Sequence, residues 1–178
     1  MSILPIIQLE KKDFAKKGTI LRQTSQQVSD FGDEFQKFID ELVETLKDNP
    51  ISIGLSAPQV GKLIRVSVIN LNEGKKEPTL IIVNPKIISW SGKKDKKKES
   101  CMSLPHYRGE VERRKKVELS FQDRYGIWHQ ENFEGFIAHV VGHEIDHLDG
   151  ILYIDRMESG SKLESVDFFR TLNSEIKK

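Results

Sequence analysis

The sequence His143-Glu144-Ile145-Asp146-His147 lies in a segment, Phe136–Leu148, whose apolar residues recur at helical spacing. Asp149-Gly150 follows and is typical of a helix end. Two histidines four residues apart point from the same face of a helix, so both imidazoles can bind one metal ion. An ordinary helix that carries the pattern by chance is the alternative. Two buried histidines in an apolar helix need polar partners, however, and a metal ion would satisfy both.

A third metal ligand has to come from elsewhere, since catalytic zinc-like sites usually take three protein ligands and keep one open position. No histidine follows His147, and the chain has one cysteine, Cys101. Cys101 lies in Glu99-Ser100-Cys101-Met102-Ser103, and a thiolate is a strong ligand for this class of cation. A small buried cysteine is the structural alternative, and spacing alone leaves the choice open.

The segment Gly54–Gly61 is a loop of small residues bounded by glycines, with one amide side chain, Gln59. It lacks the Lys-Ser/Thr ending that reaches phosphates, so it is not a phosphate loop. A tight turn between elements is the ordinary interpretation. The glycines indicate that the backbone passes close to another group here.

The rest of the chain predicts an α+β fold, with mostly antiparallel short β-sheets around the central helix that carries the histidine motif. An N-terminal amphipathic helix ends at Asn49-Pro50, because the residue before a proline leaves the helical region. The expected helices are Asp30–Leu46, Phe136–Leu148 and a C-terminal helix Leu163–Ile176. The expected strands are Ile64–Ile69, Leu80–Val83, Lys86–Trp90, Lys116–Phe121, Trp128–Phe133 and Ile151–Ile154. The lysine-rich stretch Lys93–Glu99 is expected to be a solvated loop.

The composition limits the classes of function. With 178 residues, 37% of them hydrophobic, the chain is expected to form a single domain over residues 1–178. Its 28 Lys and Arg against 27 Asp and Glu leave a net charge of +1, which excludes a strong overall attraction to nucleic acid or to anionic membranes. No apolar run approaches the roughly 20 residues that span a bilayer, and Met1–Leu9 is too short for a signal peptide. A cytoplasmic location is therefore expected.

Three segments together, Gly54–Gly61, Glu99–Ser103 and His143–Gly150, resemble the three signature motifs of the peptide deformylases. The resemblance covers most of the chain. It also includes Ile20-Leu21-Arg22, Asn84-Pro85, Arg108, Val111-Glu112-Arg113 and Asp155-Arg156. Enzymes of this family remove the formyl group from the N-terminal methionine of newly made polypeptides, during protein biosynthesis, and use a metal held by one Cys and two His.

The resemblance implies a role for each motif residue. Cys101, His143 and His147 become the metal ligands, and Glu144 becomes the catalytic acid and base. Glu144 would take a proton from water and return it to the leaving amine, which releases formate. Gln59 and the backbone N–H of Met102 would face the oxyanion. Fe²⁺ is the usual metal of the family, and Zn²⁺, Ni²⁺ or Co²⁺ can occupy such a site.

The resemblance also implies how an N-formylmethionyl peptide binds. The peptide would add as a strand to backbone groups, and one pocket would take the methionine side chain. Ile53, Gly54 and Leu55 would supply the backbone groups. The pocket would be lined by Ile53, Met102, Phe136, His139 and Val140, above His143. Arg108 would lie near the downstream residues, and Leu163–Lys178 is a plausible transient contact with the ribosome. No specific nucleic-acid or membrane partner is expected.

Several residues depart from the usual family pattern. They are Ser52, Ser56, Ser100, Met102 and Gly142, at positions where the family usually has Gly, Ala, Gly, Leu and Gln. The serines in the first two motifs motivate the first of two alternatives, and the second is a protein of another class. The chain could be a paralogue that acts on a different N-acyl peptide, or a metal-stabilised binding protein without turnover. Glu144 and Gln59 argue against the second alternative, because both are intact.

Overall fold

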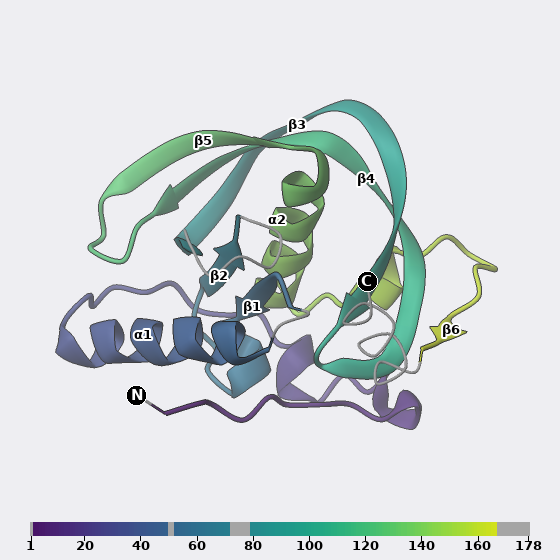
Figure 1. Cartoon of the computed structure of the whole chain (residues 1–178), viewed down its shortest axis with the longest axis horizontal. Helices are drawn as coiled ribbons and strands as arrows, with labels where there is room; N and C mark the ends of the chain where they lie inside the picture. The colour runs from purple at the N-terminus through teal and green to yellow at the C-terminus, as the bar shows by residue number, and fades with distance from the viewer. Residues whose placement is uncertain (1, 50–51, 72–78, 167–178) are drawn as a thin grey trace, which may run out of the picture.

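The computed structural model describes residues 2–49, 52–71 and 79–166, and in it helix α2 (Gly135–Leu148) lies beneath an arch of long strands (Figure 1). The helix is the one predicted from the histidine motif. Apolar side chains on it, such as Val141 and Ile145, pack into a core with residues from the sheet. This packing fixes the face of α2 that carries the histidines.

The strands form one sheet in which every described pairing between strands is antiparallel. Their order is β1-β2-β3-β4-β5, with β6 paired to β4. Their bounds are β1 Gly54–Ser56, β2 Val66–Asn70, β3 Thr79–Cys101, β4 Leu104–Gln122, β5 Trp128–Glu134 and β6 Glu164–Ser165. The predicted α+β class with an antiparallel sheet is therefore confirmed.

Two of these strands are much longer than the sequence pattern indicated. Leu80–Val83 and Lys86–Trp90, expected as separate strands, are both parts of β3. Asn84-Pro85, between these two segments, lies at a bulge, where the register with β4 shifts and Asn84 takes a positive φ of 50°. The Asn84 side chain donates to the Val28 carbonyl and to Gln122, which holds the bulge within the sheet. Lys116–Phe121 is likewise the last part of β4.

The expectation of a loop at Lys93–Glu99 is wrong, because the segment belongs to β3 and pairs with β4. Oppositely charged side chains face each other across the two strands. Lys94 lies 2.6 Å from Glu112, and Lys96 lies 3.8 Å from Glu110. Such cross-strand pairs are favourable in a sheet. The lysine side chains are mostly exposed, as expected, although the backbone is paired.

Helix α1 (Asp33–Asp48) begins three residues after the predicted start. Asp30 accepts a hydrogen bond from the Gly32 N–H, which forms a turn before the helix. The buried face of α1, including Phe38 and Leu42, packs against residues of β1 and β2. The apolar spacing therefore predicted the helix and its buried face correctly. No helix among the described residues is long and apolar enough to cross a membrane.

The prediction for the C-terminal part was less accurate. Ile151–Ile154, expected as a strand, leads into the short 3-10 helix η4 (Tyr153–Arg156), because Asp155 accepts a hydrogen bond from the Leu152 N–H. The first residues of the expected helix Leu163–Ile176 contain β6 instead, and residues 167–176 lie outside the described part of the chain. The other 3-10 helices are η1 Lys11–Asp13, η2 Ile20–Arg22 and η3 Ala57–Val60.

Candidate active site and metal centre

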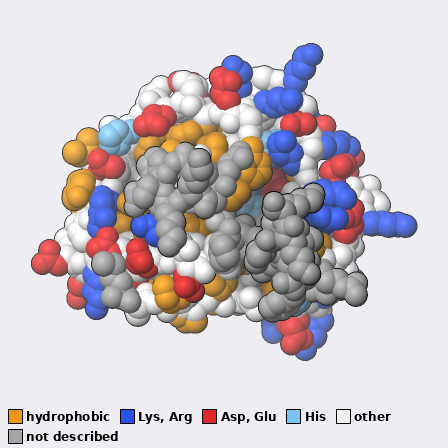
Figure 2. All heavy atoms as spheres, viewed as in Figure 1, with side chains coloured by type: hydrophobic (Ala, Val, Ile, Leu, Met, Phe, Trp, Pro, Cys, Tyr) orange, Lys and Arg blue, Asp and Glu red, His pale blue; other side chains and the backbone are white. Residues whose placement is uncertain are grey.

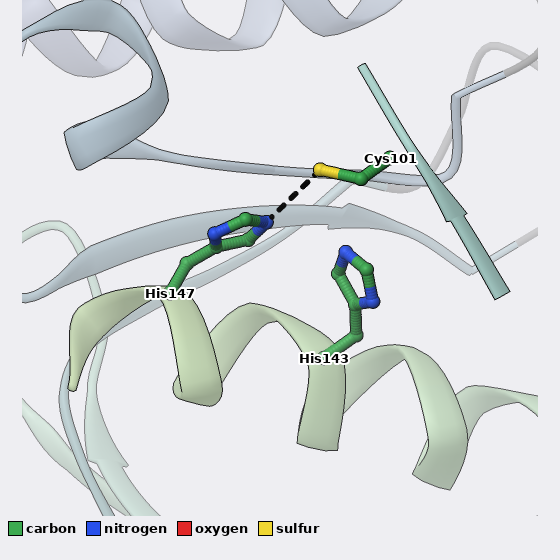
Figure 3. Close-up of side chains that lie close together, drawn as sticks. All are labelled: Cys101, His143 and His147. Atoms are coloured by element: carbon green, nitrogen blue, oxygen red, sulfur yellow. Dashed lines mark hydrogen bonds between the residues drawn. The ribbon is translucent and has the colours of Figure 1, made fainter. Parts of the chain in front are cut away.

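The fold brings Cys101, His143 and His147 together (Figure 3). The two histidines rise from adjacent turns of α2, and Cys101 faces them from the end of β3. Their potential ligand atoms all lie within 4.8 Å of one another, and Cys101 Sγ is 3.2 Å from His147 Nε2. A register shift between Ser100 and Cys101, immediately before the turn into β4, sets where the thiol lies.

A buried ion-pair network supports His143 from behind. His143 Nδ1 lies 2.9 Å from Glu99 Oε2, which directs the other ring nitrogen, Nε2, toward Cys101 and His147. Cys101, His143 and His147 together form the ligand cluster. Arg113 holds Glu99 through two hydrogen bonds of 2.6 and 3.1 Å and donates a third, of 2.9 Å, to Asp146. Asp146 also accepts from Arg156. The orientation of His143 is therefore set by residues from β3, β4 and α2.

The electrostatics of this network favour the ionised forms of two acidic groups. Burial alone would raise the pKa of Glu99, but hydrogen bonds from His143 and Arg113 outweigh it and lower the pKa to about 2. Burial would likewise raise the pKa of the Cys101 thiol, but attraction to His147 and His143 outweighs it and holds that pKa well below its usual value. A thiolate is the form of cysteine that binds metals.

Glu144 lies beside the ligand cluster and is only 3% exposed. Burial raises the pKa of its carboxyl group, and the nearby His143, His147 and Ser56 reduce that shift without cancelling it. The carboxylate occupies space that Gly54 leaves free, since a Cβ at Gly54 would lie 2.6 Å from the carboxyl carbon. The close approach that the glycine loop predicted is therefore an approach to Glu144.

Gln59 lies in η3 and is nearly fully buried. Its side-chain oxygen accepts a hydrogen bond of 2.8 Å from the Ser56 N–H. This bond points the amide nitrogen toward Cys101 Sγ, at 3.4 Å, and toward Ser103 Oγ, at 3.2 Å. The amide N–H₂ group is thus directed toward the ligand cluster.

A cavity of about 620 Å³ opens beside these residues. Its walls include most of the residues predicted for the substrate pocket, namely Ile53, Gly54, Met102, Phe136, His139, Val140 and His143. On the face in Figure 2, hydrophobic side chains lie beside lysine and arginine side chains, with histidine atoms visible between them. Two predicted residues are not part of the walls. The Leu55 side chain is buried in the core, and Arg108 is paired with Glu164 at 2.8 Å.

His139 is a polar residue in this largely apolar wall. It is 2% exposed, and neither ring nitrogen has a hydrogen-bond partner among residues 2–49, 52–71 and 79–166. Its Nδ1 lies 3.9 Å from Glu99 Oε1, which is too long for a hydrogen bond. Burial lowers the pKa of His139, which favours the neutral imidazole.

Some residues of the site were not assigned a role from the sequence. Glu99 and Arg113 were recognised only as parts of the family resemblance, and Asp146 and Ser67 were not singled out. Asp146 could have been noticed, because it follows His143 by three residues and so lies on a neighbouring face of the same helix. Ser67, whose Oγ lies 2.6 Å from that of Ser56, carries no local signal, since this contact depends on strand pairing.

The donor set at this centre fits a divalent metal ion. One buried thiol with a lowered pKa and two imidazoles form a three-ligand group typical of catalytic sites that keep a further position for water or substrate. The buried Glu144 and the directed Gln59 amide lie beside that group. Cation, carboxylate and amide donor are the components that hydrolysis of an amide needs.

Comparison with known proteins gives one consistent family. Residues 3–163 match the family model for polypeptide deformylase. A peptide deformylase of Brucella suis is 37% identical over 176 residues, covering 98% of this chain and 96% of that protein. Peptide deformylase 1 of Vibrio vulnificus is 43% identical over 135 residues, covering 76% of this chain and 79% of that protein.

Solved structures show the same similarity in three dimensions. The crystal structure of peptide deformylase from Thermotoga maritima has a TM-score of 0.78 and 30% identity, covering 89% of this chain and 99% of that chain. A peptide deformylase of Synechococcus elongatus, in complex with actinonin, has a TM-score of 0.78 and 34% identity over 88% of this chain and 82% of that one. The chain therefore belongs to the polypeptide deformylase family of metal-dependent hydrolases, which remove the N-formyl group from nascent polypeptides.

Proposed function

We propose that this chain hydrolyses the formyl group from N-formylmethionyl peptides through the residues gathered around Cys101, His143 and His147. The observation that carries the proposal is the position of Glu144 and Gln59 beside those three residues, at the wall of one cavity. The intact set of acid/base, amide donor and ligand residues favours turnover over a binding role alone.

Cys101, His143 and His147 would hold one divalent cation, with Fe²⁺ proposed from the family resemblance and Zn²⁺, Ni²⁺ or Co²⁺ compatible with the same donors. Such a cation supplies a Lewis acid that polarises the formyl carbonyl and makes water more acidic. Glu99 and Arg113 would keep the His143 ring in the orientation that binding requires.

Glu144 would act as the acid and base of the reaction. Its carboxylate takes a proton from the attacking water and gives it to the departing amine, so that formate and a free methionyl terminus leave. The position of Glu144 supports this role, because its buried carboxylate lies at the cavity wall together with Cys101 and His143.

Gln59 and the backbone N–H of Met102 would stabilise the negative charge that develops on the formyl oxygen. The Gln59 amide is oriented in advance by the Ser56 N–H, so no reorientation is needed during the reaction. One well-aimed donor of this kind is typically worth about 3 kcal/mol in the transition state.

The peptide would bind along Ile53, Gly54 and Leu55, with its methionine side chain against Phe136, His139 and Val140. The shared cavity supports the second part of this proposal. Arg108 would contact the peptide residues that follow the methionine only if the peptide displaced Glu164 from Arg108. Transient contact with the ribosome is also proposed, on the family resemblance.

Formate release tests the proposed function directly. The protein, purified without oxygen and loaded with Fe²⁺, is expected to release formate from formyl-Met-Ala-Ser and to leave acetyl-Met-Ala-Ser intact. We expect this preference because the formyl group is smaller than the acetyl group and has no methyl to place beside the cation. Faster cleavage of the acetyl peptide would favour the paralogue. No cleavage of either peptide by protein that retains its metal would favour the binding protein.

His139→Ile is expected to raise kcat/KM for formyl-methionyl peptides by up to about tenfold, because a buried polar group without a partner typically costs about 1–3 kcal/mol. The metal content should not change, since His139 is not one of the clustered ligands. His129→Gln serves as a control, because His129 pairs with Asp123 and is not one of the residues that line the cavity. An unchanged kcat/KM in His139→Ile would show that the imidazole does not oppose substrate binding.

A further inference from the structure

Ser56 and Ser67 carry two hydroxyls that the mechanism above does not use. They lie directly opposite each other on the paired strands β1 and β2, and both residues are fully buried. Their Oγ atoms are 2.6 Å apart. Buried hydroxyls need hydrogen-bond partners, so this pair has to be understood together with the groups that it contacts.

The Ser56 hydroxyl contacts Glu144 at two points. Its Oγ lies 2.6 Å from Glu144 Oε2 and 3.1 Å from the Glu144 carbonyl oxygen. Both Glu144 atoms are acceptors when the side chain is ionised, so Ser56 is the donor. Ser56 has one hydroxyl proton, and the shorter contact is to the carboxylate. Ser67 then donates to Ser56, which gives the chain a single direction, from Ser67 through Ser56 to Glu144.

The two oxygens of the Glu144 carboxylate consequently have different surroundings. Oε2 is held by Ser56, whereas Oε1 is the atom nearest to the space where a Cβ of Gly54 would lie. Gly54 and Glu144 both form part of the cavity wall. The Ser56 hydroxyl therefore fixes one of the two oxygens, Oε2, in a carboxylate that lies at the cavity wall.

We propose that Ser67 and Ser56 form a hydrogen-bond chain that holds Glu144 Oε2 and so positions the carboxylate for proton exchange with water and amine. The inference rests on the proposed function, and it assigns Ser56 and Ser67 as positioning residues. A glutamate side chain has three rotatable bonds and loses much freedom when it is fixed. Hydroxyls already in place remove the need to reach the productive rotamer in each turnover.

Ser56→Ala is the variant that tests the chain. Its kcat for formyl-Met-Ala-Ser is expected to fall about tenfold. This is a part of the 10²–10⁴-fold that a positioned acid/base typically contributes, because Glu144 itself remains. KM and metal content should stay within twofold of wild type, because Ser56 contacts neither the expected peptide nor the three ligands. Ser67→Ala, which leaves Ser56 to donate without a fixed direction, should show a smaller fall. Ser56→Thr, which retains a hydroxyl, should recover most of the rate.

Ser25→Ala is the matched control, since Ser25 is also buried and its Oγ has no partner among the described residues. It should retain the wild-type kcat. A crystal structure of Ser56→Ala provides a readout that is independent of activity, and the Glu144 carboxylate is expected in more than one rotamer. Thermal unfolding identifies variants that fail to fold. If Ser56→Ala does not fold, the kcat values of Ser67→Ala and Ser56→Thr test the hydrogen-bond chain instead.

Two results would overturn the inference. One is a kcat of Ser56→Ala within twofold of wild type, and the other is a rise in KM at unchanged kcat. A wild-type protein that releases no formate would refute the proposed function instead. The rotamers of Glu144 in the Ser56→Ala crystal would then still test the hydrogen-bond chain, and a single wild-type rotamer would reject it.

Discussion

Glu144→Gln should keep its metal and lose at least about a hundredfold in kcat, the lower end of the effect typical of a positioned acid/base. Glutamine has nearly the same shape as glutamate, and its amide oxygen can still accept the hydrogen bond from Ser56. It cannot take up a proton from water. The three clustered ligand residues do not include Glu144, so the binding of metal should be unaffected.

Two measurements check this expectation. Formate release gives kcat, and elemental analysis gives the metal bound per chain. Glu158→Gln is a suitable control, because Glu158 is an exposed carboxylate that pairs with Lys96. It should behave as wild type in both measurements. A Glu144→Gln protein that retained more than about a tenth of the wild-type rate would exclude Glu144 as the acid and base.

Cys101→Ser should lose most of its metal. The Cys101 thiol has a lowered pKa and is buried beside His143 and His147, so it offers a thiolate. A serine hydroxyl at the same position stays protonated and is a weak ligand. Loss of a supporting contact typically costs about 10–100-fold in metal affinity, and loss of a ligand should cost at least the upper end of that range. Activity should fall with the metal content.

Competition against a chelator measures the affinity of wild-type and variant proteins for Zn²⁺, which does not oxidise during the assay. Ser100→Ala is the matched control, because Ser100 precedes Cys101 and its side chain is exposed. Its affinity should equal that of wild type. Undiminished metal in Cys101→Ser would mean that Cys101 is a buried cysteine without a role in binding.

Local sequence patterns were sufficient to predict helices α1 and α2. The spacing of Phe38, Ile39 and Leu42 predicted α1, and the apolar residues around His143 and His147 predicted α2. In both helices, the periodicity of 3.6 residues decides which side chains are buried, and this periodicity is a local property. The pattern of strands without regular alternation with helices was likewise sufficient for the α+β class.

The lengths of β3 and β4 could not be predicted in the same way. Asn84-Pro85 and the lysines of Lys93–Glu99 are locally typical of turns and loops, yet both lie within β3. Pairing with β4 along most of its length, including opposite charges across the strands, overrides those local preferences. The prediction of the C-terminal helix was wrong at its start for a related reason, because Glu164 and Ser165 pair with β4.

The sequence by itself determined the motif residues, the two helices and the fold class, since each is encoded in residues close together in the chain. Only the tertiary structure decided which other residues contact the motif residues. It placed Cys101 beside the histidines, Glu99 and Arg113 behind His143, and the pair Ser56 and Ser67 against Glu144. Each of these contacts depends on strand register, where a shift of one residue turns every side chain to the other face of the sheet.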